Sequence, residues 1–176
     1  MKSQIYRRFV IIGLPGSGKS TFASKLGKRL GIPVHHLDRH MFVAGGKKRD
    51  KEEFLSIQRE MVNEEAWIIE GCAMSSLEMR VAQADSVIYF HLPRLLCIWR
   101  AFKRFLTNDN ALGDTAEGCS KVFNWELVSY IWNFDRDKRK DIEDLQNRYP
   151  QIDFQVFDSS KDAEDYLEKH SMPLSL

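Results

Sequence analysis

The apolar residues of this chain follow two alternating spacings. Five short runs of consecutive apolar residues are typical of buried strands, and they lie at 9–12, 34–37, 67–71, 86–92 and 154–157. Between them, apolar positions three and four residues apart predict helices at 21–30, 51–64, 75–84, 94–106, 123–149 and after Ser159. Strands that alternate with helices predict a three-layer α/β/α sandwich around a five-stranded parallel sheet.

One stretch interrupts the helical pattern late in the chain. Residues 107–120 have little apolar periodicity and contain Gly113 and Gly118. We expect a loop that joins two helices and can fold over a bound ligand as a lid. No repeat or low-complexity linker divides the 176 residues, so we expect a single domain over 1–176.

The composition narrows the class of protein. Hydrophobic residues make up 43% and charged residues 29%, which is ordinary for a soluble globular protein, and the net charge is +1. This balance does not support direct nucleic-acid binding or attraction to an anionic membrane. Three cysteines without a Cys-x-x-Cys pair favour reduced thiols, and with no signal peptide or membrane span we expect a cytoplasmic protein.

The first predicted strand leads into Gly13-Leu14-Pro15-Gly16-Ser17-Gly18-Lys19-Ser20, the pattern of a P-loop. A strand before the motif and a helix after it are the context in which this pattern binds phosphate. The sequence therefore predicts a nucleotide-binding site formed by Gly13, Pro15, Gly16, Ser17, Gly18, Lys19, Ser20 and Thr21.

The residue types of the motif fit that chemistry. Glycines let backbone N–H groups close around phosphate oxygens, and the start of the helix adds partial positive charge. Lys19 can reach the β- and γ-phosphates, and Ser20 can offer its hydroxyl to Mg²⁺. We therefore expect ATP and Mg²⁺ as cofactors.

Two acidic residues lie where predicted strands end. In an open parallel sheet, ligands bind at the carboxyl ends of the strands. Asp38 can order Mg²⁺ waters or hold a substrate hydroxyl, or it can cap the next turn. Glu70, followed by Gly71, can contact Mg²⁺ or water, or it can pair with a nearby lysine. No aspartate follows the fourth strand, where His91 stands, which counts against a large motor ATPase.

Several arginines are candidates for substrate contacts. Arg80 either binds substrate or pairs with Asp85. Arg136 and Arg139 either close on the transferring phosphate from the far side of a lid or lie on a solvated helix face.

The helix at 94–106 is amphipathic. Its predicted apolar face consists of Leu95, Ile98, Trp99, Phe102, Phe105 and Leu106, with Arg100, Lys103 and Arg104 on the opposite side. Like charges one turn apart repel, so the cationic cluster suits an anion bound above it, although solvated cations are the alternative. In the next helix we expect Trp125 and Trp132 to pack in the core or the lid.

These features resemble adenylate kinase and other nucleoside monophosphate kinases. The resemblance rests on Arg100 and Arg104 after the fourth strand, on Glu70-Gly71, and on the loop at 107–120. It implies a nucleoside-kinase type of fold with a helical lid insertion. It also implies that Arg100 lies by the adenine and that Arg104 touches the phosphates.

A closer resemblance extends nearly end to end, to the adenylate-kinase-related proteins labelled "DNA topology modulation protein". It is carried by Gly31-Ile32-Pro33-Val34-His35-His36-Leu37-Asp38, Trp67-Ile68-Ile69-Glu70-Gly71, Leu92-Pro93-Arg94, Ala116-Glu117-Gly118-Cys119 and Ile131-Trp132-Asn133-Phe134. The chain departs from that family at Gly46, where members carry tryptophan, and at Ser75 and Leu112-Gly113, where they carry arginine. The departures imply a weaker kinase or a different acceptor.

The sequence thus predicts an ATP-binding kinase that transfers the γ-phosphate to a small acceptor, a nucleotide or nucleoside. Lys19, Arg104 and Arg139 are the expected catalytic residues. Asp38, Glu70, Gly71, Arg80 and Arg136 are expected to bind the acceptor, and Ser20 and Glu70 the Mg²⁺. The alternatives are a nucleotide-dependent regulatory protein that affects DNA topology and a simple NTPase.

Overall fold

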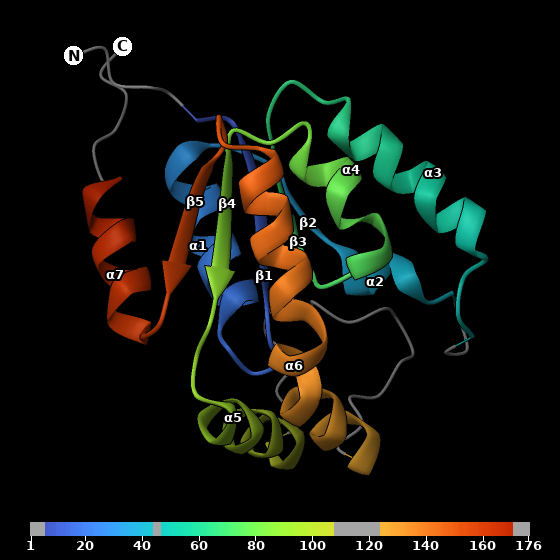
Figure 1. Cartoon of the computed structure of the whole chain (residues 1–176), viewed down its shortest axis with the longest axis vertical. Coiled ribbons are helices and arrows are strands. Elements are labelled where there is room, and N and C mark those ends of the chain that lie inside the picture. The colour runs from blue at the N-terminus through green and yellow to red at the C-terminus, as the bar shows by residue number, and fades with distance from the viewer. Residues whose placement is uncertain (1–5, 44–46, 108–123, 171–176) are drawn as a thin grey trace.

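The computed structural model describes residues 6–43, 47–107 and 124–170. A parallel sheet in the order β2-β3-β1-β4-β5 forms its centre (Figure 1). Its strands are β1 (Arg8–Gly13), β2 (Val34–His36), β3 (Trp67–Glu70), β4 (Ser86–Phe90) and β5 (Asp153–Phe157). The predicted five-stranded parallel sheet is confirmed.

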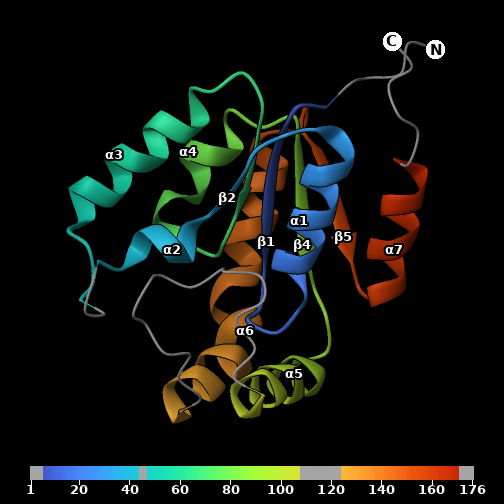
Figure 2. The same ribbon diagram turned by 180° about the vertical axis from the view of Figure 1, so that it is seen from behind.

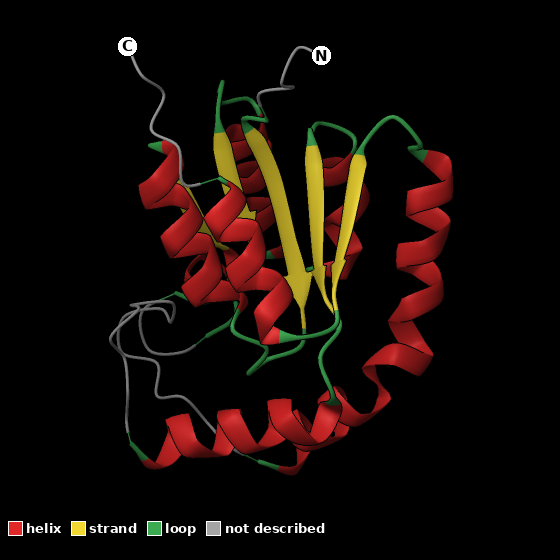
Figure 3. Ribbon diagram, turned by 90° about the vertical axis from the view of Figure 1, so that its left-hand side faces the viewer, coloured by secondary structure: helices red, strands yellow, loops and turns green. Residues whose placement is uncertain are grey.

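Helices cover both faces of the sheet (Figures 1 and 2). One face carries α1 (Lys19–Leu30) and α7 (Ser160–Lys169), and the other carries α3 (Lys51–Val62), α4 (Leu77–Val81) and α6 (Trp125–Arg148). Figure 3 shows the resulting layers edge-on. The predicted three-layer sandwich is therefore also confirmed.

The remaining helices lie around the carboxyl ends of the strands. They are α2 (Leu37–Met41), the 3₁₀ helix η1 (Met74–Ser76) and α5 (Arg94–Leu106), which runs across the end of the sheet (Figure 1). The sequence did not predict α2, whose single turn is too short for a periodicity to register.

The central strands explain why their sequences read as continuous apolar runs. Val10 on β1 is paired with Ile69 on β3 and Val87 on β4, and all three side chains are fully buried. Parallel strands covered on both faces have no solvent side that would require polar residues. The sheet is thus a rigid base from which the loops at its carboxyl edge project.

Helix α5 does not pack as its sequence predicts. Much of the expected apolar face is exposed, with Leu95 at 72% and Trp99 at 60%, although Ile98 packs partly buried against the core, and Cys97 and Ala101 are buried. A Cβ on Gly16 would lie 2.2 Å from the carbonyl oxygen of Cys97, so the helix backbone touches the P-loop. The apolar face predicted for this helix is therefore not its main packing face, because the close approach to the P-loop requires the face with small side chains.

The tryptophans of α6 are exposed as well. Trp125 is 82% and Trp132 is 52% accessible, and the Arg94 guanidinium lies over the Trp132 ring at 5.8 Å. Packing in the core is therefore wrong for both, whereas packing against the lid stays a prediction because residues 108–120 lie outside the described ones.

Parts of the sequence prediction lie outside the described residues. These are the lid at 107–120 apart from Thr107, and the departures at Gly46 and Leu112-Gly113. Within the described ranges, no helix combines the length and the apolar character needed to cross a membrane.

Candidate functional site

The P-loop connects the end of β1 to the start of α1. Gly16 and Gly18 adopt positive φ values of 81° and 93°, a conformation that glycine tolerates best. The Ser17 N–H donates to the Leu14 carbonyl oxygen at 3.1 Å, which closes the turn. The predicted nucleotide-binding residues, 13 and 15–21, thus form one continuous turn and helix start.

Lys19 is held by a buried acid at the end of β3. Its Nζ lies 3.3 Å from Oε1 of Glu70, and the Nδ1 of His36 lies 2.8 Å from Oε2 of the same carboxylate. The three side chains are at most 10% exposed. Glu70 therefore pairs with the lysine of the P-loop, one of the two roles left open by the sequence.

The two charges stabilise each other. Burial alone would raise the pKa of Glu70, but Lys19 and the hydrogen bond from His36 hold it below its usual value. Burial alone would lower the pKa of Lys19, but Glu70 and then Asp38 raise it above its usual value. The site therefore presents a permanently charged ammonium to its ligand.

A small cavity of about 70 Å³ lies over the P-loop. Its charged lining consists of Lys19, Asp38 from the first turn of α2, and Arg104 from α5. The structure thus brings together three residues that lie far apart in the sequence and that were singled out separately. Asp38 is exposed at this opening, so its carboxylate can meet a second ligand.

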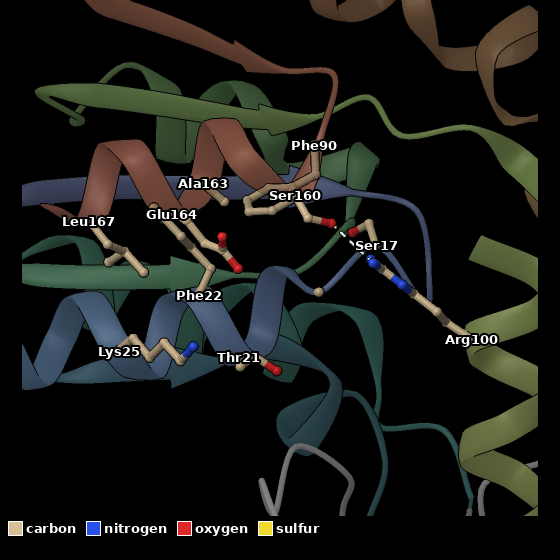
Figure 4. Close-up of a pocket in the computed structure, with 11 residues that line it drawn as sticks. Ser17, Thr21, Phe22, Lys25, Phe90, Arg100, Ser160, Ala163, Glu164 and Leu167 are labelled. Carbon is tan, nitrogen blue, oxygen red and sulfur yellow. Dashed lines mark hydrogen bonds between the residues drawn. The ribbon is translucent and has the colours of Figure 1, made fainter. Parts of the chain in front are cut away.

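A larger cavity of about 310 Å³ begins at Ser17, Gly18 and Thr21 and extends between α1 and α7 (Figure 4). At its P-loop end, Nη2 of Arg100 donates to Oγ of Ser160 at 3.0 Å. Phe22 and Phe90 supply apolar walls. A phosphate on the P-loop would thus lie next to an apolar space with an arginine at its entrance.

Two oxygen donors at the P-loop fit Mg²⁺. Oε1 of Glu70 is buried beside the Lys19 ammonium and accepts no well-aligned hydrogen bond within the described part of the chain. Ser20 stands in the first turn of α1. Carboxylate and hydroxyl oxygens are hard ligands of the kind Mg²⁺ prefers. Among the described residues, no group of three or more His, Cys, Asp or Glu side chains converges, so a metal here would need ligands from a nucleotide.

Arg80 occupies a different place from the one predicted. Its side chain is fully buried, and its Nη1 and Nη2 donate to the carbonyl oxygens of Gly71 at 3.1 Å and Ala73 at 2.7 Å. Burial lowers the pKa of this guanidinium to about 10. This placement contradicts a substrate contact and also the alternative pairing with Asp85: Arg80 positions the loop after β3, which begins at Gly71.

Arg136 and Arg139 do not line either cavity at the P-loop. Arg136 is exposed and donates to Asp137, and Arg139 donates to Glu143 one turn along α6. Arg139 lines a separate cavity with His91, on the α6 side of β4 and β5. The structure therefore places both arginines on the exposed helix face, the alternative left open by the sequence, and does not bring them to the P-loop.

Sequence reasoning missed one residue at the site, Cys72. Gly13 N–H donates to the sulfur of Cys72 at 3.2 Å, and the Cys72 thiol donates to the Gly13 carbonyl oxygen at 3.0 Å. Its position directly after Glu70-Gly71, at the carboxyl end of β3, is the signal that could have identified it.

Comparison with known proteins rests on structure alone. The fold is similar to that in the crystal structure of shikimate kinase from Bacteroides thetaiotaomicron, with a TM-score of 0.53, 16% identity, and coverage of 94% of this chain and 96% of that one. The fold is kinase-like. A shikimate kinase from Aquifex aeolicus is also similar, with a TM-score of 0.47, 16% identity and coverage of 92% of each chain.

The sequence comparisons do not assign the chain to a family. No protein-family model matches the chain, and no curated protein matches it. At 16% identity the likeness concerns the fold, so the chemistry has to be argued from the site itself.

Proposed function

We propose that this protein is an ATP-dependent kinase that transfers the γ-phosphate to a small acceptor, a nucleotide or nucleoside. The observation that carries the proposal is the cavity in which the P-loop turn, Lys19, Asp38 and Arg104 meet. Phosphoryl transfer is catalysed mainly by positioning and by stabilisation of charge, and this cavity offers both.

Each residue then has a definite task. The backbone N–H groups of the P-loop bind the phosphates, and Lys19 leaves Glu70 to neutralise the charge that develops on them. Arg104 stabilises the transferring group from the side of α5, and Asp38 accepts a hydrogen bond from the acceptor hydroxyl. Bound Mg²⁺ would neutralise phosphate charge, with Ser20 and Glu70 as the residues that hold it or its waters.

The acceptor would lie between residues 38–50 and 70–80. Because a shikimate kinase has a similar fold, a small hydroxy acid is an alternative to a nucleotide as the acceptor. Ser75, where the resembling family carries arginine, is exposed in η1. The missing guanidinium on that side supports the second candidate, a nucleotide-dependent regulatory protein of the DNA topology modulation type with little turnover.

A coupled assay of ADP release from Mg-ATP, with nucleoside monophosphates, nucleosides, shikimate and sugars as acceptors, tests the proposal. We expect one compound to accelerate ADP release strongly. Lys19→Ala should reduce that rate by orders of magnitude, whereas Lys28→Ala, on the exposed last turn of α1, should not.

The remaining outcomes separate the alternatives. Tight ATP binding that no acceptor accelerates would favour the regulatory protein. ATP hydrolysis that is independent of every acceptor would favour a simple NTPase. Acceptor phosphorylation that survives Lys19→Ala unchanged would overturn the assignment.

A further inference from the structure

The larger cavity contains a carboxylate without a partner. Glu164 lies on α7 and lines the cavity opposite Phe22 and Lys25 of α1 (Figure 4). Within the described residues, no hydrogen bond or ion pair reaches its carboxylate. On the same helix, Asp162 has a local partner in the capping box with Ser159, and Asp165 and Glu168, which lack one among the described residues, do not line the cavity. Glu164 is therefore available to a ligand.

The position of the cavity indicates which part of a ligand it receives. It starts at the P-loop, where Oγ of Ser17 is buried and lacks a hydrogen-bond partner among the described residues. Its walls farther along are Phe22, Phe90 and Leu167. Flat apolar walls next to a phosphate site suit the base of a nucleotide. This step rests on the proposed function, which puts the phosphates on the P-loop.

We infer that Glu164 selects the base of the bound nucleotide by accepting a hydrogen bond from an exocyclic amino group. A carboxylate can only accept, so it favours a base edge that carries N–H and repels one that presents a carbonyl oxygen. Hydrogen bonds to a charged group are stronger than neutral ones. Lys25 lines the same cavity and can only donate, so the cavity presents one acceptor and one donor to the base.

Two matched pairs of nucleotides test this inference. ATP and purine riboside triphosphate differ only in the 6-amino group, and GTP and ITP differ only in the 2-amino group. Equilibrium binding of each would be measured in the presence of Mg²⁺. We expect the wild-type protein to prefer the amino-bearing member of one pair by about tenfold, the effect of one hydrogen bond to a charged group.

The variant Glu164→Gln keeps the shape of the side chain but can both donate and accept. We expect it to reduce that preference to about twofold or less. The matched control is Glu168→Gln, one turn farther along α7 and outside the cavity, which should keep the preference.

The outcomes distinguish this inference from the proposed function. If the wild-type protein binds nucleotides but prefers neither amino-bearing member, the inference is wrong and the proposed function stands. The same holds if Glu164→Gln retains the full preference. If no nucleotide binds at all, the proposed function fails and the inference fails with it.

Discussion

Lys19 and Glu70 form a buried ion pair in the site that we propose binds phosphate. Removing two charges from water is costly, and their mutual attraction offsets that cost only when both are present. His36 satisfies the second carboxylate oxygen of Glu70, which fixes the orientation of the acid. Under the proposed function, a bound phosphate would replace Glu70 as the partner of Lys19.

We therefore expect Glu70→Gln to destabilise the protein by about 2–4 kcal/mol at pH 7, because Lys19 loses its counterion. The pKa of Glu70 lies below its usual value of 4.5 in the folded state, so its charge stabilises the fold above that pH. This contribution is lost as the pH falls through the folded pKa, and the two proteins should then become more alike. Urea denaturation of both proteins at several pH values between about 3 and 7 measures the difference in their free energies of unfolding.

The control for this variant is Glu78→Gln, which removes an exposed acid paired with Arg148. Surface pairs contribute little, so its stability should follow that of the wild type at every pH. A Glu70→Gln protein as stable as the wild type at pH 7 would contradict the account of the buried pair.

Cys72 is expected to position the P-loop through its two hydrogen bonds to Gly13. Cys72→Ala removes both and should weaken Mg-ATP binding by about fivefold, the effect of about 1 kcal/mol. Cys72→Ser retains a group that donates and accepts, so it should recover most of the affinity. Titration calorimetry measures both variants.

Cys97→Ala serves as the control, because it keeps the backbone that meets Gly16 and removes only the buried thiol, which lies 4.0 Å from the Leu92 carbonyl oxygen. It should change stability more than affinity. If Cys72→Ala bound Mg-ATP as tightly as the wild type, Cys72 would be a packing residue only.

At the level of residues, the sequence predicted the part of the candidate site that lies within one continuous stretch of the chain. Lys19 and the glycines around it are defined by one motif, and the structure forms them as that motif requires. Arg80 could not be placed, because an arginine that satisfies backbone carbonyls reads in sequence like one that binds substrate. Glu164 became visible only when the fold brought α7 beside the P-loop.

At the level of the elements, the contact of α5 with the P-loop restricts which residues the chain can carry at the two surfaces that touch. Gly16 has a positive φ, and a Cβ there would clash with the Cys97 carbonyl oxygen at 2.2 Å. Gly18 has a similar φ, but a Cβ on it would meet no atom within 4 Å. A substitution at Gly18 therefore tests the strained backbone conformation alone, whereas a substitution at Gly16 also tests the steric contact with α5.

We expect Gly18→Ala to lower the free energy of unfolding by about 1–2 kcal/mol, the cost of a left-handed residue with a side chain. Gly16→Ala should cost clearly more, because α5 must also move. Thermal unfolding of both variants without ligand provides the comparison. Equal destabilisation would mean that α5 shifts freely and does not constrain the P-loop.

The same contact explains why sequence reasoning failed for α5. Amphipathicity identifies a helix and two faces, but it assumes that the apolar face is the buried one. Here the face with Cys97 and Ala101 is buried because only small side chains let the two backbones touch. The contact depends on Gly16, which lies far from α5 in the sequence, so the periodicity of the helix does not predict it.

For the whole molecule, nucleotide binding should be visible as stabilisation. A ligand at 100 times its dissociation constant adds about 2.7 kcal/mol, which raises the Tm of a protein of this size by about 5–10 °C. We expect this shift with Mg-ATP for the wild type and for Lys28→Ala, and a much smaller one for Lys19→Ala. A wild-type Tm that Mg-ATP leaves unchanged would contradict a nucleotide site.

The architecture was the most predictable property of the chain. Apolar runs at β1, β3 and β4 alternate with helical periodicity, and parallel sheets covered on both faces require that pattern. The short α2 was missed because one turn carries too few positions to show a period. The order of the strands became known only from the structure, since apolar patterning does not specify neighbours.

The position of β5 and α7 in the chain has a consequence for how the protein is made. Residues 153–169 supply the outer strand and one wall of the larger cavity, whereas the P-loop belongs to the first 21 residues. During synthesis, the P-loop residues therefore leave the ribosome well before the cavity wall on α7 does. If a nucleotide binds as proposed, its binding assists folding only after α7 has been made.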